Sequence, residues 1–184
     1  MSCASSRSDY LAARDARHAQ ILAACRLAQE TRAGAVVVAS TNLPGPEKNR
    51  PGLEILVERS LATLSARGLH LMLASAGTDL LGPYRFLVAA EPAATIKPLT
   101  VTLERDLPGG RVLDLDVLTP DGDPVDRESL GLEPRCCYVC DRPARECILL
   151  ARHPLQELLA VVDAHLALAD APEAGREPDC RGAS

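Results

Sequence analysis

The chain has 184 residues, of which 47% are hydrophobic, and it carries a net charge of −5. This length fits one domain, and its core must be aliphatic because the chain contains one Phe, three Tyr and no Trp. The acidic balance argues against a duplex-binding surface, and the scarcity of aromatic rings argues against a stacking platform for single-stranded nucleic acid.

Hydrophobic periodicity predicts helices that alternate with strands along the chain. In the first half, the expected elements are a helix from a cap at Ser8 or Asp9 to about Arg32, a strand at 35–40, a helix after Pro51 that ends near Gly68, and strands at 69–74 and 84–90 around a turn-rich loop at 77–83. The segment 95–107 fits either a helix or a strand, and we favour a helix capped by Thr95. In the remainder, the expected elements are a strand at 111–118, an irregular Cys-rich stretch at 127–149 and a helix with Pro154 in its first turn.

These elements predict an α+β (mixed α/β) fold in which a mixed β-sheet is flanked by helices. A single domain at 8–169 holds all of them, and the tails at 1–7 and 170–184 are expected to be disordered. No apolar run approaches the roughly 18 to 20 residues that span a bilayer, and Met1–Tyr10 lacks a signal-peptide core. We therefore expect a soluble, cytoplasmic protein with neither a nucleic-acid nor a membrane partner.

The expected strand at 111–118 carries two carboxylates. Asp114 and Asp116 lie two residues apart, so they point to one face of a strand while the apolar residues around them point to the core. Two carboxylates this close repel each other unless a cation lies between them, and Mg²⁺ (or Mn²⁺), shared with substrate phosphates, is the expected ion. Arg111 at the strand start is a candidate for neutralising phosphate charge. The alternative is an exposed edge strand with a polar face.

A loop rich in Pro and Gly follows the first expected strand, at 42–49. A rigid loop between a strand and a helix can bring backbone N–H groups and a lysine to an anion. Asn42, Gly45 and Lys48 are therefore candidate substrate-binding residues. The loop lacks the spacing of a P-loop, and the competing interpretation is a surface turn.

Four of the seven cysteines crowd between Cys136 and Cys147. Three of them and a histidine follow the order and spacing of a four-ligand Zn²⁺ site: Cys137, Cys140, Cys147 and His153. Cys136 is an alternative to Cys137 as the first ligand. The competing hypothesis is that the thiols are reduced and metal-free, and that His153 meets substrate phosphates.

In order, these segments resemble one family, the apo-citrate lyase phosphoribosyl-dephospho-CoA transferases, also called citrate lyase holo-[acyl-carrier-protein] synthases. The resemblance is carried by Asn-Leu-Pro-Gly-Pro-Glu-Lys-Asn at 42–49, Pro-Gly-Gly-Arg-Val-Leu-Asp-Leu-Asp-Val at 108–117, Cys-Tyr-Val-Cys at 137–140, Arg-Pro-Ala-Arg-Glu-Cys at 142–147 and Arg-His-Pro-Leu at 152–155. It covers the chain from about Ser8 to Leu166 and adds Arg152 to the candidate substrate-binding residues.

The resemblance implies nucleotidyltransferase-like chemistry. A serine hydroxyl of the citrate lyase acyl carrier protein (gamma subunit) would attack the α-phosphorus of 2′-(5″-triphosphoribosyl)-3′-dephospho-CoA, so that pyrophosphate leaves and a phosphodiester remains. A divalent metal on Asp114 and Asp116 would offset the triphosphate charge, and one of these carboxylates would act as base. Two alternatives stay open: a related transferase that acts on the malonate decarboxylase carrier protein, and a non-enzymatic zinc-stabilised module that binds a carrier protein.

Overall fold

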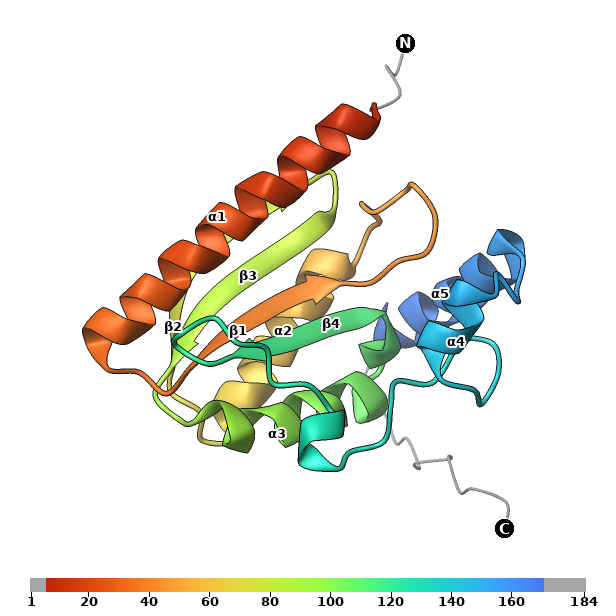
Figure 1. Ribbon diagram of the computed structural model, residues 1–184. Coiled ribbons are helices and arrows are strands. Elements are labelled where there is room, and N and C mark those ends of the chain that lie inside the picture. Colours follow the sequence, from red (N-terminus) through yellow and green to blue (C-terminus); the bar gives the residue numbers. More distant parts are fainter. Residues whose placement is uncertain (1–5, 171–184) are drawn as a thin grey trace.

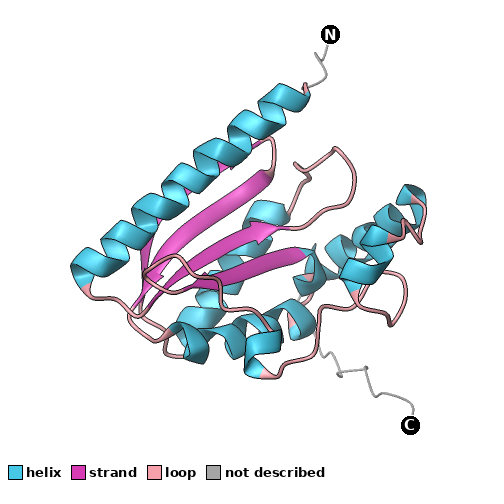
Figure 2. Cartoon of the chain, viewed as in Figure 1, coloured by secondary structure: helices cyan, strands magenta, loops and turns pink. Residues whose placement is uncertain are grey.

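The computed structural model of the protein describes residues 6–170. These residues form a four-stranded sheet with helices on both faces (Figures 1 and 2), which confirms the expected α+β class. The tails expected at 1–7 and 170–184 lie outside the described residues, apart from three residues at their inner ends. Of these, Ser6 caps the first helix, Arg7 begins it, and Asp170 ends the last helix.

Five helices, four strands and two 3₁₀ turns (η) make up the described part of the chain. In order they are α1 (Arg7–Thr31), β1 (Ala35–Thr41), α2 (Leu53–Ala66), β2 (Leu71–Asp79), β3 (Gly82–Ala89), α3 (Ala93–Asp106), η1 (Gly110–Val112), β4 (Leu113–Leu118), η2 (Glu128–Leu130), α4 (Ala144–Leu149) and α5 (Leu155–Asp170). None of the helices in this range is both long enough and apolar enough to cross a membrane.

The sheet has the strand order β2-β3-β1-β4 and is antiparallel at every pairing, so the expectation of a mixed sheet is wrong in this detail. β1 and β2 run in the same direction, but β3 returns through a tight hairpin and inserts between them. The expected loop at 77–83 is therefore short, because β2 continues to Asp79 and β3 begins at Gly82. Gly77 permits this pairing, since a Cβ at that position would lie 2.7 Å from the hydroxyl oxygen of Tyr84.

Two helix starts differ from the prediction. α1 is capped by Ser6 instead of Ser8 or Asp9: the Ser6 hydroxyl accepts the N–H of Asp9 at 3.3 Å, and the Asp9 carboxylate accepts the N–H of Ser6 at 2.7 Å. This reciprocal capping box satisfies two N–H groups that the helix leaves unpaired. The helix expected at 95–107 is confirmed as α3, but it begins after Pro92 and not at Thr95.

Two apolar layers enclose the sheet. One face packs against α2, α3 and α5, with Leu56, Ile96 and Val162 fully buried. The other face packs against α1, which lies across β3, β1 and β2 (Figure 1). Because Asp116 pairs with Val38 and Asp114 with Ser40, both aspartates lie on the α1 face of the sheet. They stand outside the apolar cluster that α1 covers.

Candidate functional site

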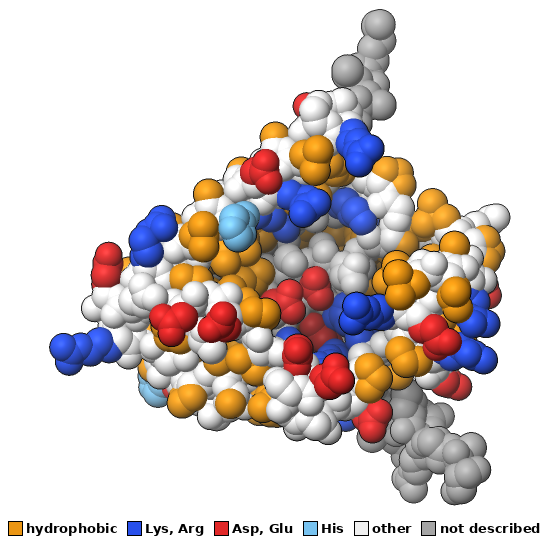
Figure 3. Space-filling view, viewed as in Figure 1, with side chains coloured by type: hydrophobic (Ala, Val, Ile, Leu, Met, Phe, Trp, Pro, Cys, Tyr) orange, Lys and Arg blue, Asp and Glu red, His pale blue; other side chains and the backbone are white. Residues whose placement is uncertain are grey.

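The two aspartates of β4 share one face of the strand, as their spacing predicts. Their side chains are 40% and 61% exposed for Asp114 and Asp116, whereas the alternating residues Leu113, Leu115 and Val117 are buried. Figure 3 shows acidic side chains on the floor of a hollow, with basic side chains on both sides of it. The open face of β4 is thus a negatively charged floor between positive walls.

Behind this floor, a buried carboxylate of α3 holds two arginines. Glu104 Oε1 accepts the N–H of Leu115 at 2.7 Å and lies 2.9 Å from Nη2 of Arg135. Its other oxygen, Oε2, accepts a hydrogen bond from Arg127. Glu104 is buried, and these charge-assisted hydrogen bonds compensate the loss of solvent around it. The network fixes Arg135 at the edge of β4.

Each aspartate faces one cation. Arg135 Nη1 lies 3.5 Å from Asp114 Oδ1, and Lys97 Nζ lies 3.7 Å from Asp116 Oδ1. Burial and the negative charge of Asp116 together raise the pKa of Asp114 to about 6, against the opposing charge of Arg135. Within residues 6–170, neither carboxylate accepts a hydrogen bond. Their oxygens therefore keep lone pairs with which they can bind a cation.

Glu104, Lys97 and Arg135 are absent from the residues predicted by the motifs. The sequence contains a pattern that could have identified two of them. Lys97 and Glu104 lie about two helical turns apart, and both are buried on the apolar side of α3. Charged residues on a buried helix stripe are rare unless they are paired. Arg135 gives no such signal, since it reaches Glu104 only because the chain returns to β4 after η2.

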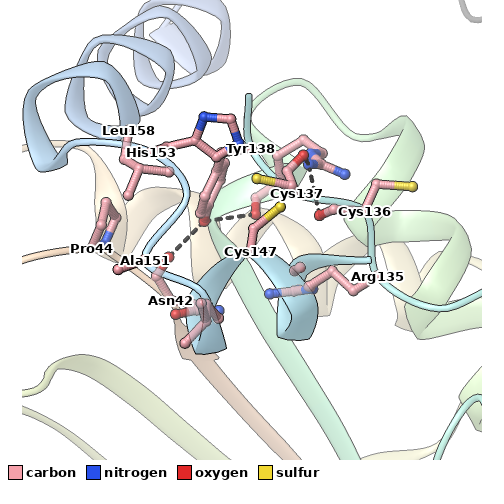
Figure 4. Close-up of a pocket in the computed structure, with 13 residues that line it drawn as sticks. Asn42, Pro44, Arg135, Cys136, Cys137, Tyr138, Cys147, Ala151, His153 and Leu158 are labelled. Atoms are coloured by element: carbon pink, nitrogen blue, oxygen red, sulfur yellow. Dashed lines mark hydrogen bonds between the residues drawn. The ribbon is translucent and has the colours of Figure 1, made fainter. Parts of the chain in front are cut away.

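A pocket of about 280 Å³ has Arg135 in its wall (Figure 4). It is formed by the loop after β1, by η1, by the Cys-rich segment and by α5, with the lining residues Asn42, Pro44, Arg111, Arg135, Cys136, Cys137, Tyr138, Ala144, Cys147, Ile148, Ala151, His153 and Leu158. Asp114 and Asp116 are not in this lining, and Arg135 connects the two features because it also contacts Asp114.

Arg111 and Tyr138 join the walls of this pocket. Arg111 lies in η1 and not in the strand that was expected at 111–118, because the turn at Gly109 delays the start of β4. Its Nη2 donates to the carbonyl oxygens of Cys136 and Cys137 at 3.1 and 2.6 Å. The Tyr138 hydroxyl donates to the carbonyl oxygens of Asn42 and Arg111 at 2.6 and 3.1 Å. The predicted residues Asn42 and Arg111 are thus brought together.

The other predicted substrate-binding residues lie at or beyond the edge of the pocket. Lys48 Nζ donates to the Leu43 carbonyl in its own loop, and burial lowers the pKa of Lys48. Gly45 has φ +74°, and a Cβ there would lie 3.1 Å from the side chain of Leu155, so glycine lets the loop pass close to α5. Arg152 is exposed and does not line the pocket.

The predicted cysteine and histidine ligands come together in space. One ligand atom from each of Cys137, Cys140, Cys147 and His153 lies within 4.8 Å of all the others. Cys140 Sγ is 3.5 Å from Cys147 Sγ and 3.3 Å from His153 Nε2. Cys136 is exposed and its sulfur points away from the group (Figure 4), which excludes it from the cluster. Three sulfurs and one imidazole can together bind a metal ion.

The thiols of this cluster influence each other's ionisation. Burial opposes ionisation of Cys137, but hydrogen bonds from the backbone N–H groups of Val139 and Cys140 and from the thiols of Cys147 and Cys140 together lower the pKa of Cys137. Burial and the neighbouring sulfurs of Cys140 and Cys137 together raise the pKa of Cys147 to about 11. A single thiolate therefore forms first, and a second negative charge is disfavoured unless a cation compensates it.

A family model for apo-citrate lyase phosphoribosyl-dephospho-CoA transferase matches residues 5–168. A Streptococcus pyogenes serotype M18 protein described as a probable member is 31% identical over 162 residues, which is 84% of this chain and 82% of that protein. The enzyme so named from Escherichia coli O7:K1 is 34% identical over 132 residues, 70% of this chain and 72% of its own. The Citrobacter koseri enzyme is 42% identical over 89 residues, 48% of this chain and 49% of its own. The chain therefore belongs to the apo-citrate lyase phosphoribosyl-dephospho-CoA transferase family, as its motifs predict.

Proposed function

We propose that the protein transfers the phosphoribosyl-dephospho-CoA group to the acyl carrier protein of citrate lyase. The family and the names of the relatives support this choice of donor and acceptor. The structural observation that carries the proposal is the Asp114 and Asp116 pair on the open face of β4, next to a wall that contains Arg111 and Arg135. Carboxylates beside fixed positive charge suit a substrate with three phosphates.

The proposed reaction is a substitution at phosphorus. The hydroxyl oxygen of a carrier-protein serine forms a bond to the α-phosphorus of 2′-(5″-triphosphoribosyl)-3′-dephospho-CoA. The bond from that phosphorus to the oxygen that bridges to the β-phosphorus breaks, and pyrophosphate leaves with its electron pair. The serine hydroxyl loses its proton to a base, and a phosphodiester links the two partners.

The residues of β4 would hold a divalent cation and accept this proton. The pair fits a cation, because the raised pKa of Asp114 reflects burial and the negative charge of Asp116. Mg²⁺ or Mn²⁺ would, when bound, offset the charge that develops on the leaving pyrophosphate. Of the two carboxylates, Asp114 is the better matched base, since its pKa of about 6 lies closer to neutral pH than the ordinary value.

Positive charge and backbone N–H groups around the pocket would bind the remaining phosphates. Arg111 lies in the pocket wall, while Lys48 and Arg152 lie in segments that border it. The loop that contains Asn42 and Gly45 would contribute backbone donors. Zn²⁺, the ion that three thiolates and one imidazole favour, would have a structural role at the cysteine cluster.

The test is incubation of the protein with Mg²⁺, triphosphoribosyl-dephospho-CoA and the apo-carrier protein of citrate lyase. We expect pyrophosphate release together with a mass gain of the carrier equal to one phosphoribosyl-dephospho-CoA group. A carrier with its acceptor serine changed to alanine should show neither. If only the malonate decarboxylase carrier gains mass, the acceptor is assigned wrongly. If neither carrier is modified, the transferase function itself is wrong.

A further inference from the structure

The Cys-rich segment between Thr119 and Pro154 has almost no apolar core. Within it only Cys137 and Cys147 are buried. Three consecutive apolar residues at α4 face solvent instead, since Ile148, Leu149 and Leu150 are 74%, 76% and 60% exposed. Apart from Val125 and Tyr138, which are partly buried against the main core, burial of apolar surface therefore contributes little to holding this segment in place. Its two buried side chains are both thiols, and both belong to the four-residue cluster.

We propose that Cys137, Cys140, Cys147 and His153 bind one Zn²⁺ ion, and that this ion fixes the wall that carries Arg111 and Arg135 beside the aspartate pair. The metal site stands on its own geometry, whereas its consequence for substrate binding rests on the proposed function.

The observed distances match a tetrahedral site. With Zn–S bonds of about 2.3 Å, tetrahedral ligand atoms lie about 3.8 Å apart. Cys140 Sγ lies 3.5 Å from Cys147 Sγ and 3.3 Å from His153 Nε2, and no pair of the cluster exceeds 4.8 Å. To bind an ion, the ligand atoms would therefore need to move by about an ångström or less, without a rearrangement of the backbone. The four side chains would fill all four coordination positions of the ion, which is typical of structural zinc and not of catalytic zinc.

Groups around the cluster orient its ligands as the surroundings of a metal do. His153 Nδ1 lies 3.3 Å from Glu157 Oε2, one turn further along the chain. This contact directs Nε2 toward the sulfur of Cys140, and a carboxylate behind a histidine is the usual support of a zinc ligand. The backbone N–H groups of Val139 and Cys140 face the sulfur of Cys137, where they would stabilise a metal-bound thiolate.

The cluster joins three neighbouring pieces of chain. Cys137 and Cys140 lie in a turn, Cys147 lies in α4, and His153 precedes α5. Arg111 donates to the carbonyl oxygens of Cys136 and Cys137, so its position depends on this turn. The carbonyl of Arg135 accepts the N–H of Ala144, the first residue of α4, at 2.7 Å. An ion that fixes the turn and α4 therefore fixes both arginines.

The direct test is metal analysis of protein purified without chelator, alongside Cys140→Ser. Cys136→Ser is the matched control, because Cys136 is the neighbouring thiol that points away from the cluster. We expect about one zinc per chain in the wild type and in Cys136→Ser, and little zinc in Cys140→Ser. Replacement by Co²⁺ should give the visible absorption of a tetrahedral thiolate site. Metal-free wild-type protein, or equal zinc in both variants, overturns the proposal.

A second measurement uses only wild-type protein, so it remains decisive if Cys140→Ser fails to fold. Removal of zinc by a chelator should expose the chain between Thr119 and Pro154 to limited proteolysis, and added Zn²⁺ should restore protection. Unchanged cleavage after complete zinc removal would contradict the structural role. In the transfer assay, zinc removal should raise KM for the nucleotide more than it lowers kcat. If zinc is bound but no transfer occurs, the proposed function fails and the metal site stands.

Discussion

The guanidinium group of Arg135 lies 3.5 Å from the carboxylate of Asp114. Arg135 also lines the pocket and directly precedes the cysteine turn, so one side chain links the candidate metal pair to the Cys-rich segment. Glu104 holds it in place from below, 2.9 Å away.

We predict that the candidate Mg²⁺ site weakens as the pH falls through about 6. Asp114 has a pKa of about 6, raised first by burial and then by the charge of Asp116, so a proton competes with the metal below that pH. Calorimetric Mg²⁺ titrations at one pH above and one below this value measure the effect. In Asp116→Asn the pKa of Asp114 should fall, which carboxyl-carbon NMR can follow. A wild-type Asp114 that titrates near the ordinary 3.8 contradicts the account.

The same pKa shift predicts a pH-dependent stability difference. The folded-state pKa of Asp114 lies above its ordinary value of 3.8, so the folded protein binds the proton more tightly than the unfolded chain does. Ionisation therefore reduces stability as the pH rises from about 4 to about 6. Asp114→Asn has no carboxyl group to ionise at this position. The free energy of unfolding of Asp114→Asn should therefore rise relative to that of the wild type as the pH increases across this range. A constant difference would show that the carboxyl titrates normally.

We predict that Glu104→Gln lowers the free energy of unfolding by about 2 to 4 kcal/mol, because it leaves two partly buried arginines without their charged partner. Glu104 contacts both Arg127 and Arg135 and is 7% exposed in its side chain. Glu133→Gln, an exposed glutamate in the same region, is the control and should unfold like the wild type. Equal urea midpoints for both variants would mean that the network adds nothing to stability.

We predict that Lys48→Met raises KM for the nucleotide roughly fivefold, equivalent to the loss of about 1 kcal/mol from one hydrogen bond. Methionine keeps the apolar stem but removes the ammonium group, which donates to the Leu43 carbonyl and closes the loop after β1. Melting temperature and KM should be measured together. A lower melting temperature with unchanged KM would assign Lys48 a purely structural role.

Local patterns in the sequence predict most of the fold and part of the site. The two-residue repeat of a β-strand predicts that Asp114 and Asp116 lie on one face. The spacing of the ligands from Cys137 to His153 predicts the cluster that the structure brings together. The antiparallel topology is not predictable in this way, since it depends on β3 inserting between β1 and β2. Arg135 is missed because its partners lie in β4 and α3, far away along the chain.

The central claim is that Asp114 and Asp116 carry the transfer reaction. The most direct measurement is Mg²⁺-dependent pyrophosphate release, in the presence of apo-carrier protein, by Asp114→Asn and Asp116→Asn. Asp123→Asn, an exposed aspartate in the turn after β4, is the matched control. We predict that each site variant loses about 3 kcal/mol or more of transition-state stabilisation, roughly a hundredfold or more in kcat. Both should keep the wild-type circular dichroism spectrum, and Asp123→Asn should keep full activity. Near wild-type pyrophosphate release by both folded site variants would contradict the claim.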